Sequence, residues 1–221
     1  MMRLWGRASS INVQKILWCL HELGLKEGAD YERIDAGLQF GVVNTPEFLA
    51  LNPNGLVPTL QDESFALWES NSILRYLARK YDQKSRFPAD INSQASADKW
   101  MDWQLTTFWP AVRPAFLGLT RIPENERNYD LIRKDYETAS SHLRILNQAL
   151  ESHLYCAGNR FSLADIALGL CVNRWIMLAE KFPERVGRRT SYPAIEAWMK
   201  RLESETCLLY TSDAADDSLR V

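Results

Sequence analysis

Apolar residues at the start of the chain alternate between spacings typical of strands and of helices. Residues 3–6 form a short apolar run, and the polar loop 7–12 separates them from the first helical pattern. In that pattern apolar side chains recur at i, i+3, i+4 and i+7, as Val13, Ile16, Leu17 and Leu20. Gly24 then supplies a stop signal. The pattern predicts a strand, a loop and a helix.

The next residues continue this alternation of short strands and helices. The expected elements are a strand at 31–35, a short helix at 46–51, paired strands at 57–60 and 65–68, and a helix at 69–81. A strand–helix–strand start followed by two strands and a helix is the thioredoxin-like arrangement, and its parallel first pair requires a crossover. We therefore predict an α/β domain of thioredoxin-like fold over residues 1–81.

The rest of the chain shows only helical spacing. Residues 82–92 are polar and predict an interdomain linker, so that 93–207 form an all-helical domain. One segment carries apolar residues spaced 4, 3, 4, 3 and 4 apart, which are Ile132, Tyr136, Ala139, Leu143, Leu146 and Leu150. This heptad seam is typical of a helix packed lengthwise in a bundle. The second domain is therefore expected to be a helical bundle.

Three local signals refine the expected bundle. Pro110 and Pro114 are expected to kink or interrupt its first helical segment. Ser162 and Asp165 predict a capping box at the start of a later helix. Pro193 marks the first turn of the last helix.

Composition and charge exclude several classes of function. The chain has 221 residues, 46% of them hydrophobic, and a net charge of -2 from 26 basic and 28 acidic side chains. This balance favours neither a nucleic acid nor an anionic membrane as partner. No apolar run approaches the roughly 20 residues of a membrane helix. The four cysteines lack metal-binding spacing, so we expect free thiols, no metal and a cytoplasmic location.

The stretch 52–81 carries the most specific chemical pattern. Turn residues precede Val57 and Pro58, where a proline suits a strand start or a cis turn. Glu69 and Ser70 open a helix, and the unpaired N–H groups of a helix start attract a carboxylate. Glu69 can hold an ammonium group, so the pair suits both ends of an amino-acid zwitterion. Taken alone, Ser70 or its neighbour would more simply cap the helix.

The segment NPNGLVPTL, followed eight residues later by WESNSILRYLARKY, resembles the glutathione-binding half of cytosolic glutathione transferases. The resemblance extends over most of the chain, and it is to serine-type bacterial members of theta-, zeta- or phi-like character. It implies that the backbone at Val57 and Pro58 pairs with the cysteinyl part of glutathione. It also implies that Glu69 and Ser70 hold the γ-glutamyl end of the tripeptide.

The loop 8–12 lies between the first strand and the first helix, where α/β sheets place ligands. By the resemblance, this loop carries the group that faces the glutathione sulfur. It contains no tyrosine or cysteine, and Ser10 best matches the catalytic serine, with Ser9 second and Asn12 third. A hydroxyl that donates to the sulfur lowers the pKa of the thiol. On local sequence alone, the same three residues are candidates for capping the helix.

The resemblance also suggests residues further from the sulfur. Gln39 and Asn54 are expected to contribute to glutathione binding. Trp103, Thr107 and Phe108 are candidates for a pocket that holds a small hydrophobic electrophile, although an aromatic stripe on a helix is more commonly core. The implied protein is a detoxifying homodimeric glutathione transferase, with glutathione as co-substrate.

Other activities of the same scaffold remain open. The glutathione thiolate can reduce a peroxide instead of attacking an electrophile, and the sequence does not separate these reactions. A non-catalytic relative that binds ligands or proteins is a further alternative. A disulfide oxidoreductase is disfavoured, because the first loop has no cysteine.

The helical pattern fails after Glu205. Composition shifts abruptly near Cys207, and residues 208–221 resemble a translated cloning adaptor. We expect a poorly ordered tail and leave open whether it is native.

Overall fold

The structure is a computed structural model that describes residues 1–208. The chain divides into two compact units. The N-terminal unit comprises Met1–Phe87 with the described residues 206–208, and the helical unit comprises Pro88–Glu205. The division after Phe87 falls inside the stretch 82–92 that the sequence suggested as a linker, and the precise domain limits remain a prediction. The tail beyond Leu208 lies outside the described residues.

A four-stranded sheet in the order β2-β1-β3-β4 forms the centre of the N-terminal unit. β1 (Met2–Trp5) pairs in parallel with β2 (Tyr31–Ile34) and antiparallel with β3 (Thr59–Asp62). β4 (Phe65–Trp68) pairs antiparallel with β3 and forms one edge of the sheet. The single parallel pair is joined by a helical crossover, as the sequence predicted.

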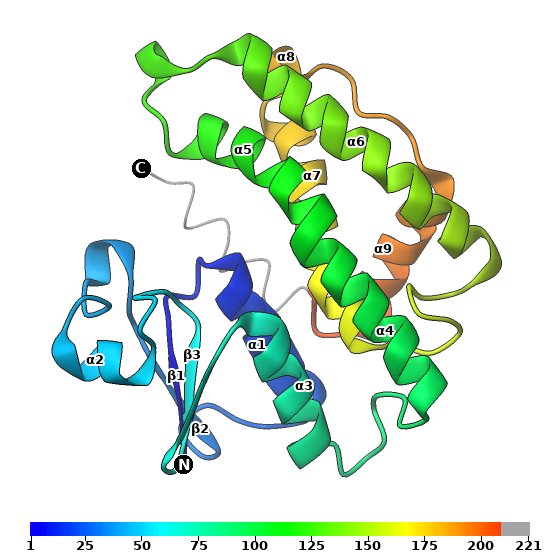
Figure 1. The fold of residues 1–221 in the computed structure, drawn as a ribbon. Coiled ribbons are helices and arrows are strands. Elements are labelled where there is room, and N and C mark those ends of the chain that lie inside the picture. The colour runs from blue at the N-terminus through cyan, green and yellow to red at the C-terminus, as the bar shows by residue number, and fades with distance from the viewer. Residues whose placement is uncertain (209–221) are drawn as a thin grey trace. The chain divides into compact units, whose positions relative to one another are not determined.

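Helices cover both faces of this sheet (Figure 1). α1 (Ile11–Glu22) and α3 (Ser70–Tyr81) pack against each other, and α2 (Pro46–Leu51) lies on the other side of the sheet. The short 3-10 helix η1 (Leu38–Phe40) was not predicted. The thioredoxin-like fold expected from the sequence is confirmed.

The helical unit is an all-α bundle, again as predicted. Its elements are α4 (Ile91–Trp103), η2 (Gln104–Phe108), α5 (Trp109–Thr120), η3 (Glu124–Glu126), α6 (Tyr129–Ser152), α7 (Leu163–Lys181), α8 (Pro183–Val186) and α9 (Pro193–Glu205). α6 packs along α5 and α9, while α7 contacts α4 and α5 and is buried over most of its length. Within residues 1–208, no helix is long and apolar enough to cross a membrane.

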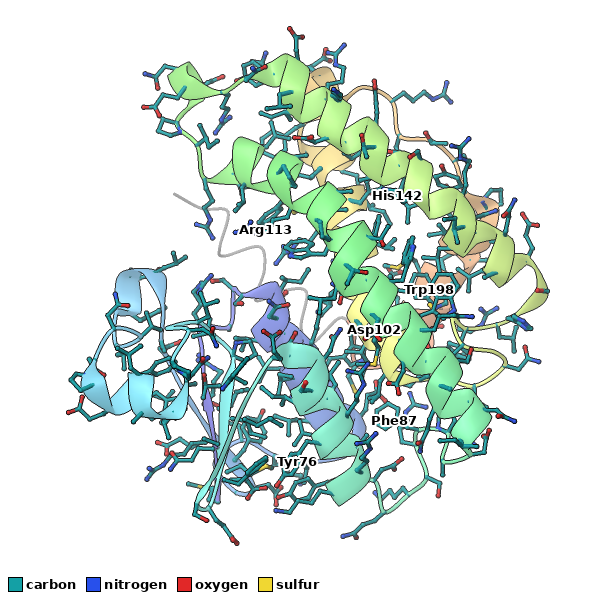
Figure 2. All side chains as sticks on the ribbon, in the orientation of Figure 1. Tyr76, Phe87, Asp102, Arg113, His142 and Trp198 are labelled. Atoms are coloured by element: carbon teal, nitrogen blue, oxygen red, sulfur yellow. The ribbon has the colours of Figure 1, made fainter. Side chains whose placement is uncertain are left out.

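The predicted heptad seam and capping box organise the core of this unit. All six seam residues of α6 are buried. Asp165 accepts hydrogen bonds from the Ser162 N–H at 2.9 Å and from the Ser162 hydroxyl at 2.8 Å. The indole of the buried Trp198, labelled in Figure 2, donates to the same carboxylate at 2.9 Å. The cap therefore also ties α9 to the start of α7.

The two prolines act differently from the expected kink or break. α4 runs into α5 through η2, a π-helical turn in which the Trp109 N–H donates to the Gln104 carbonyl five residues back. Pro110 follows directly and has no N–H to donate to the Thr106 carbonyl, which removes one α-helical hydrogen bond there. Pro114 lies inside α5 without ending it. The two prolines therefore predicted the position of the irregularity correctly. The helix forms a π-helical turn there and does not end.

Candidate functional site

The Ser10 hydroxyl lies at the start of α1 and is not used to cap it. Ser10 is the N-cap residue with an extended backbone, and its side chain makes no capping hydrogen bond. Its carbonyl instead accepts from the N–H groups of Val13 and Gln14, both at 2.9 Å. The side chain is 8% exposed, and its hydroxyl donates to no residue in the described part of the chain. The capping role that local sequence allowed for this hydroxyl is therefore wrong.

The turn at Val57 lies against the loop that precedes Ser10. Gly6 has φ +152°, and a Cβ there would lie 2.4 Å from the Val13 side chain and 3.2 Å from Val57 Cβ. Only glycine permits this close approach. The predicted cis bond between Val57 and Pro58 is present. The Val57 N–H and C=O form no hydrogen bond within residues 1–208, so both remain available to a ligand.

Ser70 meets the same end of α1 from the opposite side. Ser70 is 5% exposed, and its hydroxyl donates to Asn12 Oδ1 at 3.3 Å. The Lys15 ammonium, which is 1% exposed, lies 3.4 Å from both Ser70 Oγ and Asn71 Oδ1. Three stretches that are distant in sequence, 6–15, 57–58 and 69–71, thus converge at the N-termini of α1 and α3.

The start of α3 has an unusual backbone conformation. Glu69 is the N-cap residue, with φ +73° and no side-chain capping bond, and Ser70 is the first helical residue. The simpler interpretation, in which Ser70 or Glu69 caps the helix, is therefore wrong. A left-handed conformation at a residue other than glycine costs about 1–3 kcal/mol and is concentrated at functional sites. Here it leaves the exposed Glu69 carboxylate and the N–H groups of Ser70 and Ser72 available to a ligand.

The other two residues predicted to bind glutathione, Gln39 and Asn54, lie at the protein surface. Gln39 is exposed on η1. Asn54 is exposed in the turn before Val57, and its Nδ2 donates to Asn52 Oδ1 at 3.0 Å. Asn52 also donates to the Leu56 carbonyl at 2.8 Å, which fixes this turn. The roles of Gln39 and Asn54 toward a ligand stay predictions.

The three electrophile-pocket candidates lie at the π-helical turn of the helical unit. Phe108 is fully buried, and its ring stacks on Trp103 with centroids 5.6 Å apart and 6° between the planes. A separation of five residues suits this stack, because the i→i+5 hydrogen bonding of a π-helical turn brings residues five apart close together. Trp103 and Thr107 are partly exposed. Their role in a substrate pocket stays a prediction, while Phe108 mainly supports Trp103.

Lys15 is the site residue that the sequence reading missed. It lies four residues from both Ile11 and Cys19, which places it on the buried face of α1. A lysine on the apolar face of a helix is rare unless its charge has a use. The lysine among the apolar positions of this helix is visible in the sequence, and it could have identified Lys15 as a candidate.

The three buried cysteines offer no second source of thiol chemistry. None of the four is in a disulfide, and Cys19, Cys156 and Cys171 are buried. Burial raises the pKa of the Cys19 thiol well above its usual range, which keeps it protonated. No group of three or more potential metal ligands gathers anywhere in residues 1–208.

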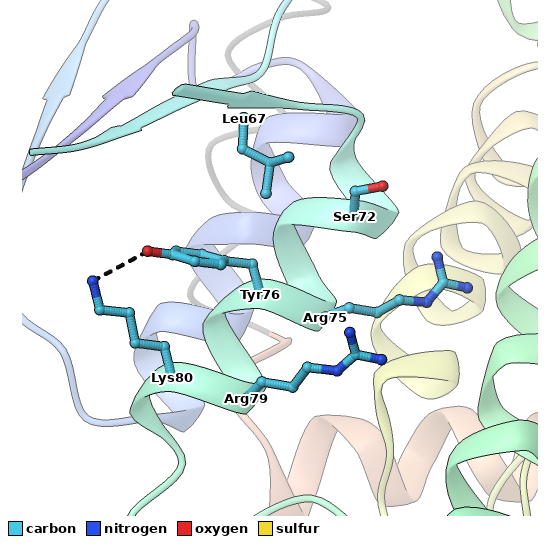
Figure 3. Close-up of a pocket in the computed structure, with 6 residues that line it drawn as sticks. All are labelled: Leu67, Ser72, Arg75, Tyr76, Arg79 and Lys80. Atoms are coloured by element: carbon cyan, nitrogen blue, oxygen red, sulfur yellow. Dashed lines mark hydrogen bonds between the residues drawn. The ribbon is translucent and has the colours of Figure 1, made fainter. Parts of the chain in front are cut away.

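A separate hollow of about 490 Å³ lies on the outer surface of β4 and α3 (Figure 3). Leu67 and the cationic side chains of α3 line it, among them Arg79 and Lys80. Beside it, the buried Asp62 carboxylate accepts from Lys80 at 2.7 Å and from Tyr76 and Tyr81 at 2.8 Å each. This cluster fastens the end of β3 to α3.

Comparisons with known proteins cover both units. The family models for the N-terminal and C-terminal domains of glutathione S-transferase match residues 1–79 and 101–205. The chain is 41% identical over 170 residues to Glutathione S-transferase GstB of Escherichia coli K12, covering 76% of this chain and 80% of that one. It is 30% identical over 205 residues to Glutathione S-transferase 3 of Zea mays, covering 91% and 88%.

Solved structures agree with this assignment. The theta class glutathione S-transferase of Xanthomonas axonopodis pv. citri, with glutathione bound, matches with a TM-score of 0.82 and 36% identity over 100% of this chain and 97% of that one. Glutathione transferase F7 of Populus trichocarpa matches with a TM-score of 0.81 and 25% identity over 97% and 99%. The chain therefore belongs to the glutathione S-transferase family and is an enzyme of the glutathione transferase type.

Proposed function

We propose that the protein binds glutathione in its N-terminal unit and transfers it to a small hydrophobic electrophile, with Ser10 activating the thiol. The observation that carries this proposal is the uncommitted Ser10 hydroxyl at the start of α1, flanked by the Val57 turn and by Ser70. The solved relative with glutathione bound supports the choice of co-substrate.

Glutathione would lie across the two helix starts. The free N–H and C=O of Val57 suit the backbone of its cysteinyl residue. The γ-glutamyl carboxylate would be held at the start of α3 by the Ser70 and Ser72 N–H groups, by the nearby Lys15 charge and by the Ser70 hydroxyl, which would turn its proton from Asn12 to the ligand. The exposed Glu69 carboxylate suits the γ-glutamyl ammonium. Glutathione held in this way would have its sulfur beside the loop that carries Ser10.

Ser10 would act by stabilising the thiolate. Its hydroxyl donates to the sulfur anion, and the positive end of α1 adds in the same direction, so both lower the pKa of the bound thiol. The thiol proton passes to solvent, and the sulfur lone pair then forms the carbon–sulfur bond to the electrophile. In a substitution the leaving group departs with the electron pair of its bond to that carbon, and in an addition the pair of the bond that opens takes up a proton from solvent. Ser10 is thus a hydrogen-bond donor throughout and is never acylated or alkylated.

The pH dependence of thiolate formation tests this role. In a Ser10→Ala variant the pKa of bound glutathione should rise by one unit or more, and the conjugation rate near neutral pH should fall at least ten-fold with little change in glutathione affinity. Ultraviolet absorbance of the enzyme-bound thiolate measures the pKa directly. Ser9→Ala is the matched control and should behave as the parent.

The same experiment separates the three candidates. A raised thiol pKa in Ser9→Ala, with Ser10→Ala unchanged, would reassign the role to Ser9. Asn12→Ala should leave the thiol pKa unchanged and should not weaken glutathione binding, because it releases the Ser70 hydroxyl proton that Asn12 accepts. If Asn12→Ala raises the thiol pKa instead, Asn12 faces the sulfur.

A second copy of the chain is the proposed partner. Phe65 and Trp68 on the edge strand β4 are 47% and 38% exposed, beside the hollow on β4 and α3. Exposed aromatic side chains on an unpaired edge strand are typical of a protein interface. The electrophile pocket around Trp103 and Thr107, detoxification as the biological role, and a cytoplasmic location belong to the same proposal.

A further inference from the structure

A second polar hollow lies in the helical unit, remote in sequence from every residue assigned to glutathione. It encloses about 510 Å³ between α6 and the segment 186–192, which runs alongside α6 from α8 to α9 (Figure 1). This is within the roughly 300–1,000 Å³ of small-molecule sites. Three arginines line it: Arg133 and Arg144, three turns apart on α6, and Arg188 from the covering segment.

The three guanidinium groups are not neutralised by the protein. In the part of the chain that the structure describes, none of them forms an ion pair within 4.0 Å. The adjacent Arg185 and Arg189, by contrast, are each 3.5 Å from a glutamate. Arg133 and Arg144 donate only through Nε, at 3.4 Å and 3.3 Å, to main-chain carbonyls. Their terminal amino groups remain available for a ligand.

The hydroxyl groups of the hollow fall into two sets. Ser140, Ser141 and Tyr192 donate to main-chain carbonyls at 2.8, 2.7 and 2.6 Å, so their protons are committed. Thr190 makes no hydrogen bond through its side chain within residues 1–208. The Tyr136 hydroxyl is buried without a partner, and burial raises the pKa of Tyr136, so it stays a donor. The hollow is therefore rich in donors and poor in acceptors.

We propose that this hollow binds a small molecule that carries a phosphomonoester. A tetrahedral dianion presents three terminal oxygens, and each can accept from a different guanidinium, whereas a carboxylate has only two oxygens. Glu137, the one carboxylate in the lining, suits a hydroxyl or amino group on the remainder of the ligand. Such a ligand would also fasten the segment 186–192 to α6.

Calorimetric titration of the full chain at constant ionic strength tests the site, with inorganic phosphate and adenosine 5′-monophosphate as probes. Both should bind saturably, and acetate should not. Arg188→Gln should weaken both by about ten-fold or more, since a charge-assisted hydrogen bond contributes about 1.5–3 kcal/mol. The double variant Arg133→Gln/Arg144→Gln should weaken them further. The matched control Arg121→Gln, an exposed arginine outside the hollow, should bind as the parent does.

Conjugation of glutathione should be unchanged in all these variants, because the hollow contains no residue of the glutathione site. The proposal is overturned if neither phosphate probe binds saturably, or if the hollow variants bind as the parent does. It is equally overturned if Arg121→Gln loses as much affinity as Arg188→Gln, because the attraction is then diffuse charge. Acetate binding as tightly as phosphate would contradict the phosphomonoester class.

Discussion

Ser10 and Asn12 lie two positions apart in one loop, yet the fold uses their side chains differently. The sequence could place both near the sulfur, because a strand–loop–helix pattern fixes where a ligand loop lies. It could not separate them, since the contact between Asn12 and Ser70 joins residues 58 positions apart. The same limit applies to Lys15, because a helical pattern places it on the buried face of α1 but does not show which residues it contacts there.

Lys15 gives a prediction at this scale. Lys15→Met should raise the KM for glutathione by about ten-fold with a smaller effect on kcat, because the ammonium 3.4 Å from Ser70 Oγ favours a carboxylate there. A glutathione analogue that lacks the γ-glutamyl α-carboxylate separates charge from packing. Its affinity should be the same for parent and variant, and an equal loss for both ligands would assign Lys15 a purely structural role. Lys26→Met, at an exposed lysine, is the control.

At the scale of elements, the predictions succeeded wherever one helix face or one cap determined the outcome. The heptad seam of α6 and the Ser162–Asp165 box depend on spacing alone, and both are present. The π-helical turn η2 was not predicted, because Pro110 marks its place while the spacing of apolar residues does not show the extra residue of the turn. The short elements η1 and α8 were missed for a similar reason, since three or four residues carry no measurable period.

The capping box provides an element-scale test. Ser162→Ala should lower the free energy of unfolding by about 1–2 kcal/mol, because the side chain is 1% exposed and its loss leaves helix donors unsatisfied. Urea unfolding measures the loss, and Ser152→Ala, at an exposed serine, should change it little. Glutathione affinity should not change. A stability equal to the parent would mean that water replaces the cap.

The Asp62 cluster predicts a pH dependence of stability. Burial by itself would raise the pKa of Asp62, but hydrogen bonds from Lys80, Tyr76 and Tyr81 outweigh it and hold the pKa below its usual range. A lowered pKa contributes stability above the unfolded value of about 3.9, and this contribution is lost as pH falls through the folded pKa. Asp62→Asn should therefore cost about 1–3 kcal/mol at neutral pH and much less in acid.

Urea unfolding at several pH values checks this prediction. Glu63→Gln changes the neighbouring exposed carboxylate and serves as the control. A difference between parent and Asp62→Asn that persists unchanged below pH of about 3 would show that the loss comes from packing rather than from charge.

For the whole molecule, the order of elements and the composition were enough to predict two units and their fold classes. A chain in which strands alternate with helices and are followed by helices alone can pack these elements in only a few ways, because connections are short and crossovers are right-handed. Assembly is harder to predict, because an exposed aromatic residue on a strand looks the same in sequence as a buried one. The exposed fractions of Phe65 and Trp68 become visible only once β4 is placed at the edge of the sheet.

Sedimentation tests the proposed homodimer. The parent should sediment at about twice the 25.5 kDa of one chain, because pairing two copies along β4 removes the exposed Phe65 and Trp68 side chains from water. Phe65→Glu/Trp68→Glu should sediment as one chain, while Ile145→Glu, at an isolated exposed residue of α6, should not alter assembly. A monomeric parent at micromolar concentration would refute the homodimer.

The π-helical turn η2 contains one residue more than an α-helical turn would need, and the wider turn absorbs that residue. In a continuous α-helix, one extra residue would rotate every later side chain of α5 by about 100° about the axis relative to α4. The π-helical turn advances less per residue, so Val112 and Ala115 still face the core. Deleting one residue of Gln104–Phe108 would let ordinary α-helical hydrogen bonding continue from α4 into α5 and would leave these two side chains facing the core. The chain should therefore tolerate the loss of one residue at this turn better than elsewhere in α4 or α5.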